Sequence, residues 1–206
     1  MKSRLEKVWT VTPSSAPLYI RRCSKCKKKM PYYCSDKFRI NAQKRTVDVW
    51  LIYKCTKCNN TCNIDILSRV NPKSISNEEY INFQCNDADT AWKYAFDADV
   101  INANKIEADY SEIEYSMGGD IMSLEEIVEQ VEDLIVFEID FRYKLDIDLS
   151  FIIRKNLNIS LSQMEEMLSA GVITVYPPGP VRRGKAKLGQ QVIMSRAKLI
   201  KYLGKE

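Results

Sequence analysis

Two cysteine pairs of the same form occur in this chain, Cys23-Ser-Lys-Cys26 and Cys55-Thr-Lys-Cys58, with 28 residues between them. A CxxC turn directs two thiolates to one side of a tight knuckle, and two knuckles can complete a tetrahedron around one metal ion. The chain contains no histidine, so any metal must be held by Cys, Asp or Glu. The spacing therefore predicts a structural Zn²⁺ site formed by Cys23, Cys26, Cys55 and Cys58. Four protein ligands would close it and leave no open catalytic position.

Two other interpretations of these cysteines stay open: a redox pair, and buried thiols that hold no metal. A redox CxxC usually opens a helix in a βαβ unit, whereas β-like segments flank both pairs here. Lys25 and Lys57 lie inside the knuckles, and positive neighbours lower the pKa of a thiol. We expect the remaining cysteines, Cys34, Cys62 and Cys85, to be buried bystanders, with Cys62 facing the interior of a sheet.

Alternating apolar and polar residues predict strands on either side of the cysteines. Such segments cover residues 7–11, 18–20 and 61–67, and segments 37–40 and 47–53 resemble a hairpin. Within the last of these, Val47, Val49, Leu51 and Tyr53 would share one face of the sheet, with Asp48, Trp50 and Ile52 on the other. We expect Trp50 and Phe38 to lie in the core, the alternative being stacking platforms on a basic surface.

Helix signals dominate after Asn71-Pro72. Capping boxes at Ser76–Glu79, Ser123–Glu126 and Ser160–Gln163 predict three helix starts. The first would open an amphipathic helical stretch through residue 102, and Gly118-Gly119 would break the chain. The second would open a helix that carries Leu124, Ile127, Val128, Val131 and Leu134 on one side. We further expect helices over 149–157 and from 161 to Gly171, strands over 172–175 and 191–194, and a basic C-terminal helix.

Charge is segregated along the chain. Residues 1–69 contain 16 Lys and Arg against 4 Asp and Glu, residues 70–141 contain 3 against 18, and residues 142–206 contain 12 against 5. Two basic ends could bind polyanions, unless the acidic middle docks on one of them and neutralises it. The sequence thus predicts an α+β protein in three parts: a β-rich zinc ribbon over 1–70, an acidic, mainly helical connecting region over 71–141, and a small α/β RNA-binding-like module over 142–206.

Three strings, at 37–42, 47–55 and 69–75, together with Asn86-Asp87 and 95–97, resemble a bacterial family catalogued as domain of unknown function 1062. The resemblance extends over most of the chain from Trp9 onward. It supports the zinc knuckles and brings no established activity. The family usually has tryptophan where this chain has Cys62, which argues against Cys62 as a metal ligand.

Residues from about 145 to 194 resemble the small RNA-binding module first defined in ribosomal small-subunit protein four. The matching features are the segment 156–160, the Ser-capped helix, 170–173 and 188–193. The resemblance implies two short helices on a small bent sheet, with basic side chains along RNA phosphates. Leu161, Glu165 and Glu166 stand where that module usually has arginine, so the cationic surface must come from elsewhere. The candidates are Arg154, Lys155, Arg182, Arg183, Lys185 and Lys187, unless the basic loop is merely solvated.

These patterns favour a zinc-stabilised, non-enzymatic RNA-binding adaptor with rRNA or tRNA as its partner. The alternative is a protein-interaction or regulatory zinc-ribbon protein that binds a basic partner through its acidic middle. An enzyme is not expected, because no Gly-rich phosphate loop, nucleophile elbow or histidine base occurs. The one carboxylate cluster that could chelate Mg²⁺, or simply form a solvated helix face, is Asp87, Asp89, Asp97 and Asp99. The sequence has no run of about 18 apolar residues that could span a membrane, and it has no secretory signal. Its seven cysteines, an odd number, do not suit a complete set of disulfides. We therefore expect a cytoplasmic location and no membrane association.

Overall fold

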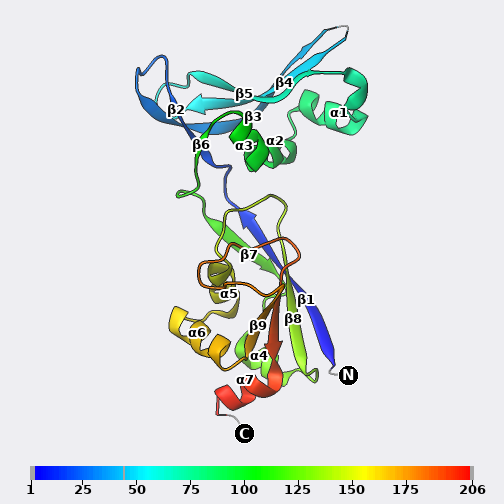
Figure 1. The fold of residues 1–206 in the computed structure, drawn as a ribbon, viewed down its shortest axis with the longest axis vertical. Coiled ribbons are helices and arrows are strands. Elements are labelled where there is room, and N and C mark those ends of the chain that lie inside the picture. Colours follow the sequence, from blue (N-terminus) through cyan, green and yellow to red (C-terminus); the bar gives the residue numbers. More distant parts are fainter. Residues whose placement is uncertain (1–2, 44, 205–206) are drawn as a thin grey trace. The chain divides into compact units, whose positions relative to one another are not determined.

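The chain, described here from a computed structural model, forms two compact units (Figure 1). We call Pro13–Glu114 the cysteine unit, and Met1–Thr12 together with Tyr115–Glu206 the terminal unit. The structure describes residues 3–43 and 45–204, so the outermost residues of the expected first and last parts lie outside it. Each unit combines a five-stranded sheet with helices, as the predicted α+β class requires. The units do not coincide with the three expected parts, because the acidic segment 71–141 is divided between them.

The sheet of the cysteine unit has the strand order β5-β4-β3-β2-β6, and all its pairings are antiparallel. Its strands are β2 (Leu18–Arg22), β3 (Lys29–Ala42), β4 (Val47–Cys55), β5 (Thr61–Val70) and β6 (Glu107–Asp109). The four predicted segments in this region are confirmed as strands, whereas β6 was not expected. Strands β2 to β5 form a meander, so the β2–β3 turn and the β4–β5 turn lie at the same end of the sheet.

Strand β4 shows why the sheet has two different faces. Its residues alternate strictly between buried and half-buried, beginning with buried Val47 and ending with buried Cys55. This confirms the expected face of Val47, Val49, Leu51 and Tyr53. Helices α1 (Asn77–Cys85), α2 (Ala88–Ala95) and α3 (Ala98–Ala103) cover that face (Figure 1).

The helical stretch expected from residue 76 to 102 is divided into these three short helices by its own side chains. The Asp87 carboxylate accepts the Thr90 N–H at 2.7 Å, and the Asp97 carboxylate accepts the Asp99 N–H at 2.8 Å. Asn86, which precedes the first of these caps, adopts a left-handed conformation with φ 58°. Asp87 and Asp97, which the sequence suggested could form part of a solvated acidic helix face, are therefore helix N-caps.

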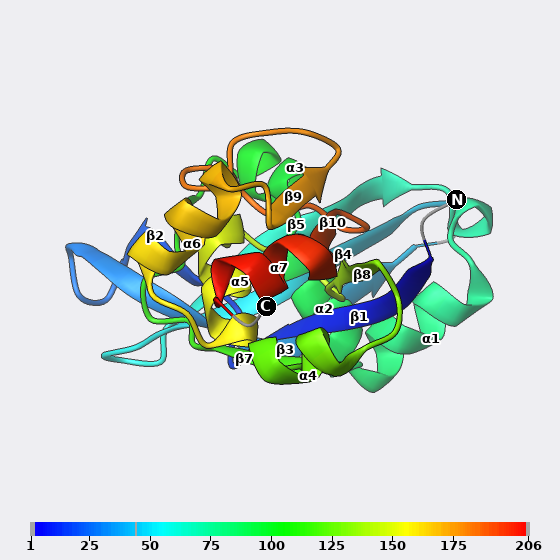
Figure 2. The same cartoon turned by 90° about the horizontal axis from the view of Figure 1, so that it is seen from below.

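The core beneath the helices has two clusters. Near the β3–β4 turn, Phe83 of α1 packs with Val47, Val49 and Ile75. Towards the cysteines, Ala91, Ala95 and Ile101 of α2 and α3 pack with residues of β2 to β5. Figures 1 and 2 both show α1 nearest the β3–β4 turn. Hydrophobic packing thus supports the sheet along its length, including the end that carries the two cysteine knuckles.

In the terminal unit the strand order is β7-β1-β8-β10-β9. The strands are β1 (Arg4–Pro13), β7 (Tyr115–Gly119), β8 (Leu134–Asp140), β9 (Ile173–Tyr176) and β10 (Gln191–Ser195). Strand β1 pairs in parallel with β8, and β10 pairs in antiparallel with both β8 and β9. The ring of Trp9 stacks on Phe137 at a centroid distance of 4.3 Å in this core. The first strand of the chain therefore belongs to the unit that contains its C-terminal third.

The helices of the terminal unit are α4 (Leu124–Glu129), α5 (Leu149–Leu157), α6 (Leu161–Ser169) and α7 (Arg196–Tyr202). The capping boxes at Ser123 and Ser160 are complete. The expectation that α4 continues to Leu134 was wrong: the helix ends at Glu129, Val131 is 86% exposed, and Leu134 begins the central strand β8. No helix in the described residues is long and apolar enough to cross a membrane.

The capping box expected at Ser76 is only half formed. The Ser76 hydroxyl accepts the Glu79 N–H at 3.1 Å. The Glu79 carboxylate instead accepts the hydroxyl of Tyr94 and lies 3.7 Å from Lys93. Tertiary contacts have therefore taken the side chain that the local motif would have used. The break expected at Gly118-Gly119 coincides with the end of β7, where Gly119 adopts a φ of 82°.

Candidate functional site

The four CxxC cysteines come together at the end of the cysteine unit's sheet. Cys23 and Cys26 lie in the β2–β3 turn, Cys55 is the last residue of β4, and Cys58 lies in the β4–β5 turn. All four sulfur atoms lie within 4.8 Å of one another, and the Sγ atoms of Cys23 and Cys58 are 3.6 Å apart. In a tetrahedral zinc tetrathiolate with bonds of about 2.3 Å, neighbouring sulfurs are about 3.8 Å apart. The cluster thus has the size of a site for one metal ion.

The two turns have the same backbone geometry, and we call residues 23–28 the first knuckle and 55–60 the second. Lys27 and Asn59, each directly after the second cysteine of its pair, adopt φ values of 62° and 56°. In the first knuckle the Lys27 N–H donates to the Cys23 carbonyl, and in the second the Asn59 N–H donates to the Cys55 carbonyl. The backbone therefore fixes the position of each sulfur pair, as a structural metal site requires.

Side-chain and backbone contacts also connect the knuckles to each other and to β3. The Asn60 amide donates to the Ser24 hydroxyl at 3.3 Å, which joins the second knuckle to the first. The Thr56 N–H and hydroxyl both donate to the carbonyl of Pro31 at 3.1 Å. These contacts hold the two turns side by side without using the sulfur atoms.

Burial and hydrogen bonding give the four thiols unequal acidity. Cys23 and Cys55 are fully buried, whereas Cys26 and Cys58 are half-buried. The Tyr32 hydroxyl and the Cys26 N–H donate to the Cys23 sulfur and lower the pKa of that thiol to about 6. The neighbouring Cys58 thiol and burial raise the pKa of Cys26 to about 12. Four crowded sulfurs cannot all ionise without a positive charge among them, and a bound cation would supply that charge.

The other three cysteines lie outside this cluster. Cys62 is half-buried on β5, opposite Tyr53 on the side of the sheet that faces the helices, as expected. Cys34 is also half-buried, on β3. Cys85 is exposed at the end of α1, so the expectation that it is buried was wrong. Within the described residues, the four CxxC cysteines form the one group of three or more His, Cys, Asp or Glu that could hold a metal.

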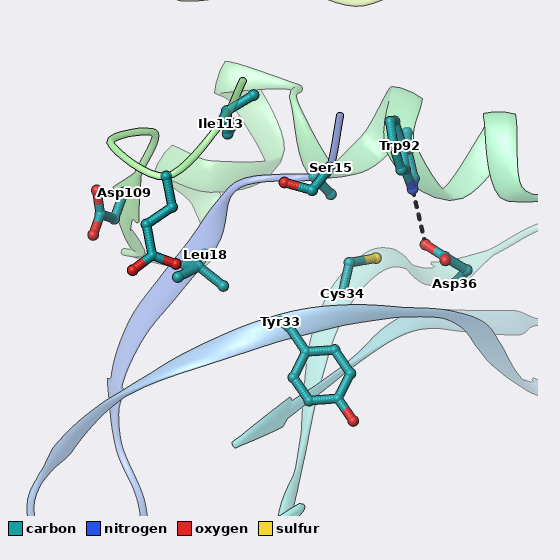
Figure 3. A pocket seen from close by; sticks show the side chains of 10 residues that line it. Ser15, Leu18, Tyr33, Cys34, Asp36, Trp92, Asp109 and Ile113 are labelled. Atoms are coloured by element: carbon teal, nitrogen blue, oxygen red, sulfur yellow. Dashed lines mark hydrogen bonds between the residues drawn. The ribbon is translucent and has the colours of Figure 1, made fainter. Parts of the chain in front are cut away.

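Cys34 opens onto a pocket of about 260 Å³ between β3, α2 and the loop after β6 (Figure 3). Its lining includes three acidic residues, Asp36, Asp109 and Glu112. The Trp92 indole N–H donates to Asp36 at 3.0 Å. Burial raises the pKa of Cys34 to about 12, so this thiol keeps its proton at neutral pH. This pocket is therefore acidic, and Cys34 is not an activated nucleophile in it.

The other face of the same sheet carries cations and aromatic rings. Cross-strand pairs on this face are Tyr33 with Lys54, Lys37 with Ile52, and Arg39 with Trp50. We call these six residues the open face. Figure 3 shows Tyr33 pointing away from the side of the strand on which Cys34, Asp36 and Trp92 lie.

The expectation that Phe38 and Trp50 are both core residues is only half right. Phe38 packs edge-on against Phe83 beneath the helices, at a centroid distance of 4.9 Å. Trp50 is half-buried on the opposite face, and its indole N–H donates to Asp65 on β5. The alternation of β4 indicated this difference, because Trp50 is out of phase with Val49 and Leu51.

The six candidate RNA-binding residues lie on or after helix α5 of the terminal unit, and several have partners there. Arg182 pairs with Glu165 at 3.1 Å, and Lys185 pairs with Asp146 and Asp148 at 3.1 and 3.0 Å. The Arg154 Nε donates to the Ser150 carbonyl of the same helix. Lys155, which lies over the Phe151 ring, Arg183 and Lys187 are exposed. The structure thus leaves three of the six with their charges directed to solvent.

The chain matches one known protein family over most of its length. The profile of "Protein of unknown function (DUF1062)" matches residues 40–177, which is more than half of the chain. The chain is a member of this DUF1062 family. The match begins after the first knuckle and ends before the basic loop at 182–187, so it includes Cys55 and Cys58 and reaches into both units. No curated protein and no solved structure matches the chain.

Proposed function

We propose that this DUF1062 protein is a zinc-stabilised RNA-binding protein without enzymatic activity. The metal part rests on four sulfurs held within 4.8 Å by two backbone-fixed knuckles. Zn²⁺ fits this donor set because it is borderline-soft, accepts four thiolates and needs no further ligand. Bound there, zinc would join β2, β3, β4 and β5 at one end of the sheet and serve as a structural cross-link.

The observation that carries the RNA proposal is the separation of charge within the cysteine unit. Residues 13–70, which form the knuckles and four strands, contain 13 Lys and Arg against 3 Asp and Glu. Residues 71–114, which form the helices on one face, contain 3 against 10. Folding thus places the acidic segment on one side of the sheet, whereas the strand residues Lys37, Arg39 and Lys54 lie on the other face. A one-sided cationic surface of this kind is the electrostatic footprint of nucleic-acid binding.

The knuckles are the densest part of that surface. Lys25, Lys27, Lys28 and Lys57 are exposed there, as is Arg22 directly before the first knuckle. Their charge would outweigh the net charge of −2 on a zinc tetrathiolate. Lys29 is the knuckle-adjacent lysine that is already neutralised, by Glu107 at 2.9 Å. In the terminal unit, Lys155, Arg183 and Lys187 would add a second cationic surface, and two surfaces on one chain would increase affinity through effective concentration.

RNA binding can be tested by fluorescence anisotropy with labelled tRNA and rRNA fragments at two salt concentrations. We compare the wild type with Lys25→Glu/Lys57→Glu and with Arg183→Glu/Lys187→Glu. A control with the same charge change, Lys73→Glu/Lys105→Glu, alters exposed lysines of the acidic segment.

We expect salt-dependent binding that both test variants weaken and the control variant leaves within about twofold. If the folded, zinc-loaded wild type binds no RNA at low salt, the RNA proposal is wrong. In that case, a protein that co-purifies through the acidic helices would favour the protein-interaction alternative.

A further inference from the structure

The side chains of the open face are suited to bind unpaired nucleotides. This inference rests on the proposed RNA function and specifies its ligand. Its six residues lie on two adjacent strands, β3 and β4, and residues of β5 border them. Within the described residues of this unit, the helices lie on the opposite side of the sheet (Figure 1). A shallow sheet face offers no element that could enter the groove of a duplex, whereas it can lie against bases that are unpaired.

The register places aromatic and cationic groups next to each other on this face. Tyr33 is directly opposite Lys54, and Arg39 is directly opposite Trp50. Directly opposed residues have Cβ atoms about 4.5–5.5 Å apart. A base stacked on either ring would therefore have a cation within reach of its phosphate. Lys37 lies two residues before Arg39 on β3, which continues the row of cations along the strand.

Polar contacts hold both aromatic rings in place, and Tyr33 is exposed whereas Trp50 is half-buried. The Tyr33 side chain is 38% exposed, and its hydroxyl donates to Asn59 of the second knuckle at 3.2 Å. The Trp50 indole N–H is already satisfied by Asp65. Rings whose polar atoms are fixed within the protein can stack on bases of any sequence, because every base has a π-face.

The carboxylates on this face do not cancel its positive charge. Asp65 accepts the Trp50 indole N–H, and Asp48 accepts the Arg69 backbone N–H at 2.8 Å. Against these two carboxylates stand Lys37, Arg39 and Lys54, and Lys57 of the second knuckle follows Lys54 by three residues in the chain. On β5, Asn63 and Thr61 lie opposite Ile52 and Lys54 and are exposed, so they supply polar groups for a ribose 2′-hydroxyl.

We propose that the open face binds single-stranded RNA, with bases stacked on Tyr33 and Trp50 and phosphates held by Lys37, Arg39 and Lys54. The test measures the affinity of labelled RNA for the full-length, zinc-loaded protein. The probes are a 12-nucleotide single strand, a hairpin duplex of matching composition and a single-stranded DNA of the same sequence.

The first variant is Tyr33→Leu, which removes the ring from an exposed position. Two matched controls are Tyr33→Phe, which keeps the ring, and Tyr176→Leu, which removes a 62% exposed tyrosine from a strand of the terminal unit. We expect Tyr33→Leu to weaken single-strand binding roughly 5- to 160-fold, the range for loss of one base stack. We expect both controls and the duplex affinity to change by about twofold or less.

The second variant is Lys37→Ala/Arg39→Ala, with Lys73→Ala/Lys105→Ala as its charge-matched control. Each cation that meets a phosphate of a single strand contributes about 0.7 to the slope of log affinity against log salt. We therefore expect the slope to fall by about 1.4 in the test variant and to stay unchanged in the control. Zinc content and the thermal midpoint of each variant confirm that it is folded.

The outcomes separate this proposal from the function on which it rests. If single strand and duplex bind equally and Tyr33→Leu binds like the wild type, the open face is not the site, although RNA binding itself stands. If Lys25→Glu/Lys57→Glu abolishes that binding, the knuckles are the site instead. Tighter binding of DNA than of RNA would overturn the assignment to RNA. Absence of all RNA binding would overturn both proposals.

Discussion

Replacing Cys55 with serine tests the metal centre directly. Cys55 is fully buried, and the backbone bonds of its knuckle, from the Cys55 N–H to Asn60 and from the Asn59 N–H to Cys55, do not involve its sulfur. Serine therefore keeps the turn and removes one thiolate. We expect the purified wild type to contain one equivalent of zinc and Cys55→Ser to contain close to none.

The expected loss of stability follows from mass action. A ligand present at 100 times its dissociation constant stabilises the folded state by about 2.7 kcal/mol, and one at 1,000 times by about 4.1 kcal/mol. For a unit of about 100 residues, 1 kcal/mol shifts the thermal midpoint by about 4–8 °C. Loss of zinc should therefore lower the midpoint of the cysteine unit by roughly 11–33 °C. Its sheet should still form, because apart from Cys23 and Cys55 the buried residues of the two hydrophobic clusters are not metal ligands.

The assay combines elemental analysis with thermal unfolding in the presence and absence of a chelator. Cys62→Ser is the matched control, since it alters a half-buried cysteine of the same sheet whose sulfur is outside the cluster. We expect it to retain one equivalent of zinc. Two results would refute the four-cysteine site. One is that Cys55→Ser retains a full equivalent of zinc. The other is that a chelator removes the metal from the wild type without lowering its thermal midpoint.

Three further predictions concern the scaffold. Phe83→Ala should destabilise the cysteine unit by ~3–5 kcal/mol in chemical unfolding, because this 1%-exposed ring fills the cluster beneath α1. Asp120→Asn should flatten the acid side of the terminal unit's stability profile. The pKa of Asp120 is lowered by the backbone N–H of the first strand, so its contribution is present above the ordinary pKa of 3.8 and is lost as pH falls through the lower folded value. Deletion of Ser35 alone should destabilise the unit more than deletion of Ser35 and Asp36 together, because one residue reverses the side of the sheet on which Phe38 lies and two residues restore it.

The features that could be predicted from the sequence are those that a short segment determines. The cysteine spacing indicated which four thiols would meet, because each CxxC turn is local and the predicted hairpin between them brings the turns to one end of a sheet. Alternation from Val47 to Tyr53 gave the buried face of β4, and Ser123 and Ser160 gave helix starts. In each case the residues that determine the structure lie within a few positions of one another.

Features that depend on distant partners could not be predicted in this way. Strand β1 pairs with β8, so that Arg4 is opposite Leu134, and no local pattern contains that information. The same pairing explains why the helix expected to include Leu134 ends earlier: a central strand gains hydrogen bonds on both sides, which outweighs a helical pattern of moderate strength. The three parts expected from charge differ from the two compact units for the same reason. The charge of a segment does not indicate which distant segment it contacts.

The position of the open face depends on an irregularity in β3. The pairing of β3 with β4 shifts between Cys34 and Lys37, where Ser35 and Asp36 are extra residues. Because the insertion is of two residues, Tyr33 and Lys37 remain on the same face, and Cys34 and Phe38 remain beneath the helices. The extra residues are themselves anchored, Ser35 to the carbonyl of Ile52 and Asp36 to the indole of Trp92.

A regular strand of the same length would place these side chains on the same two faces but without that anchor. The acidic group of the bulge turns towards the helix side, where it joins the acidic pocket instead of the cationic face. The bulge therefore does more than accommodate additional residues: it keeps a carboxylate away from the side chains that we propose bind phosphate. The charge separation of the cysteine unit is thus a product of strand register as well as of the basic and acidic segments of the chain.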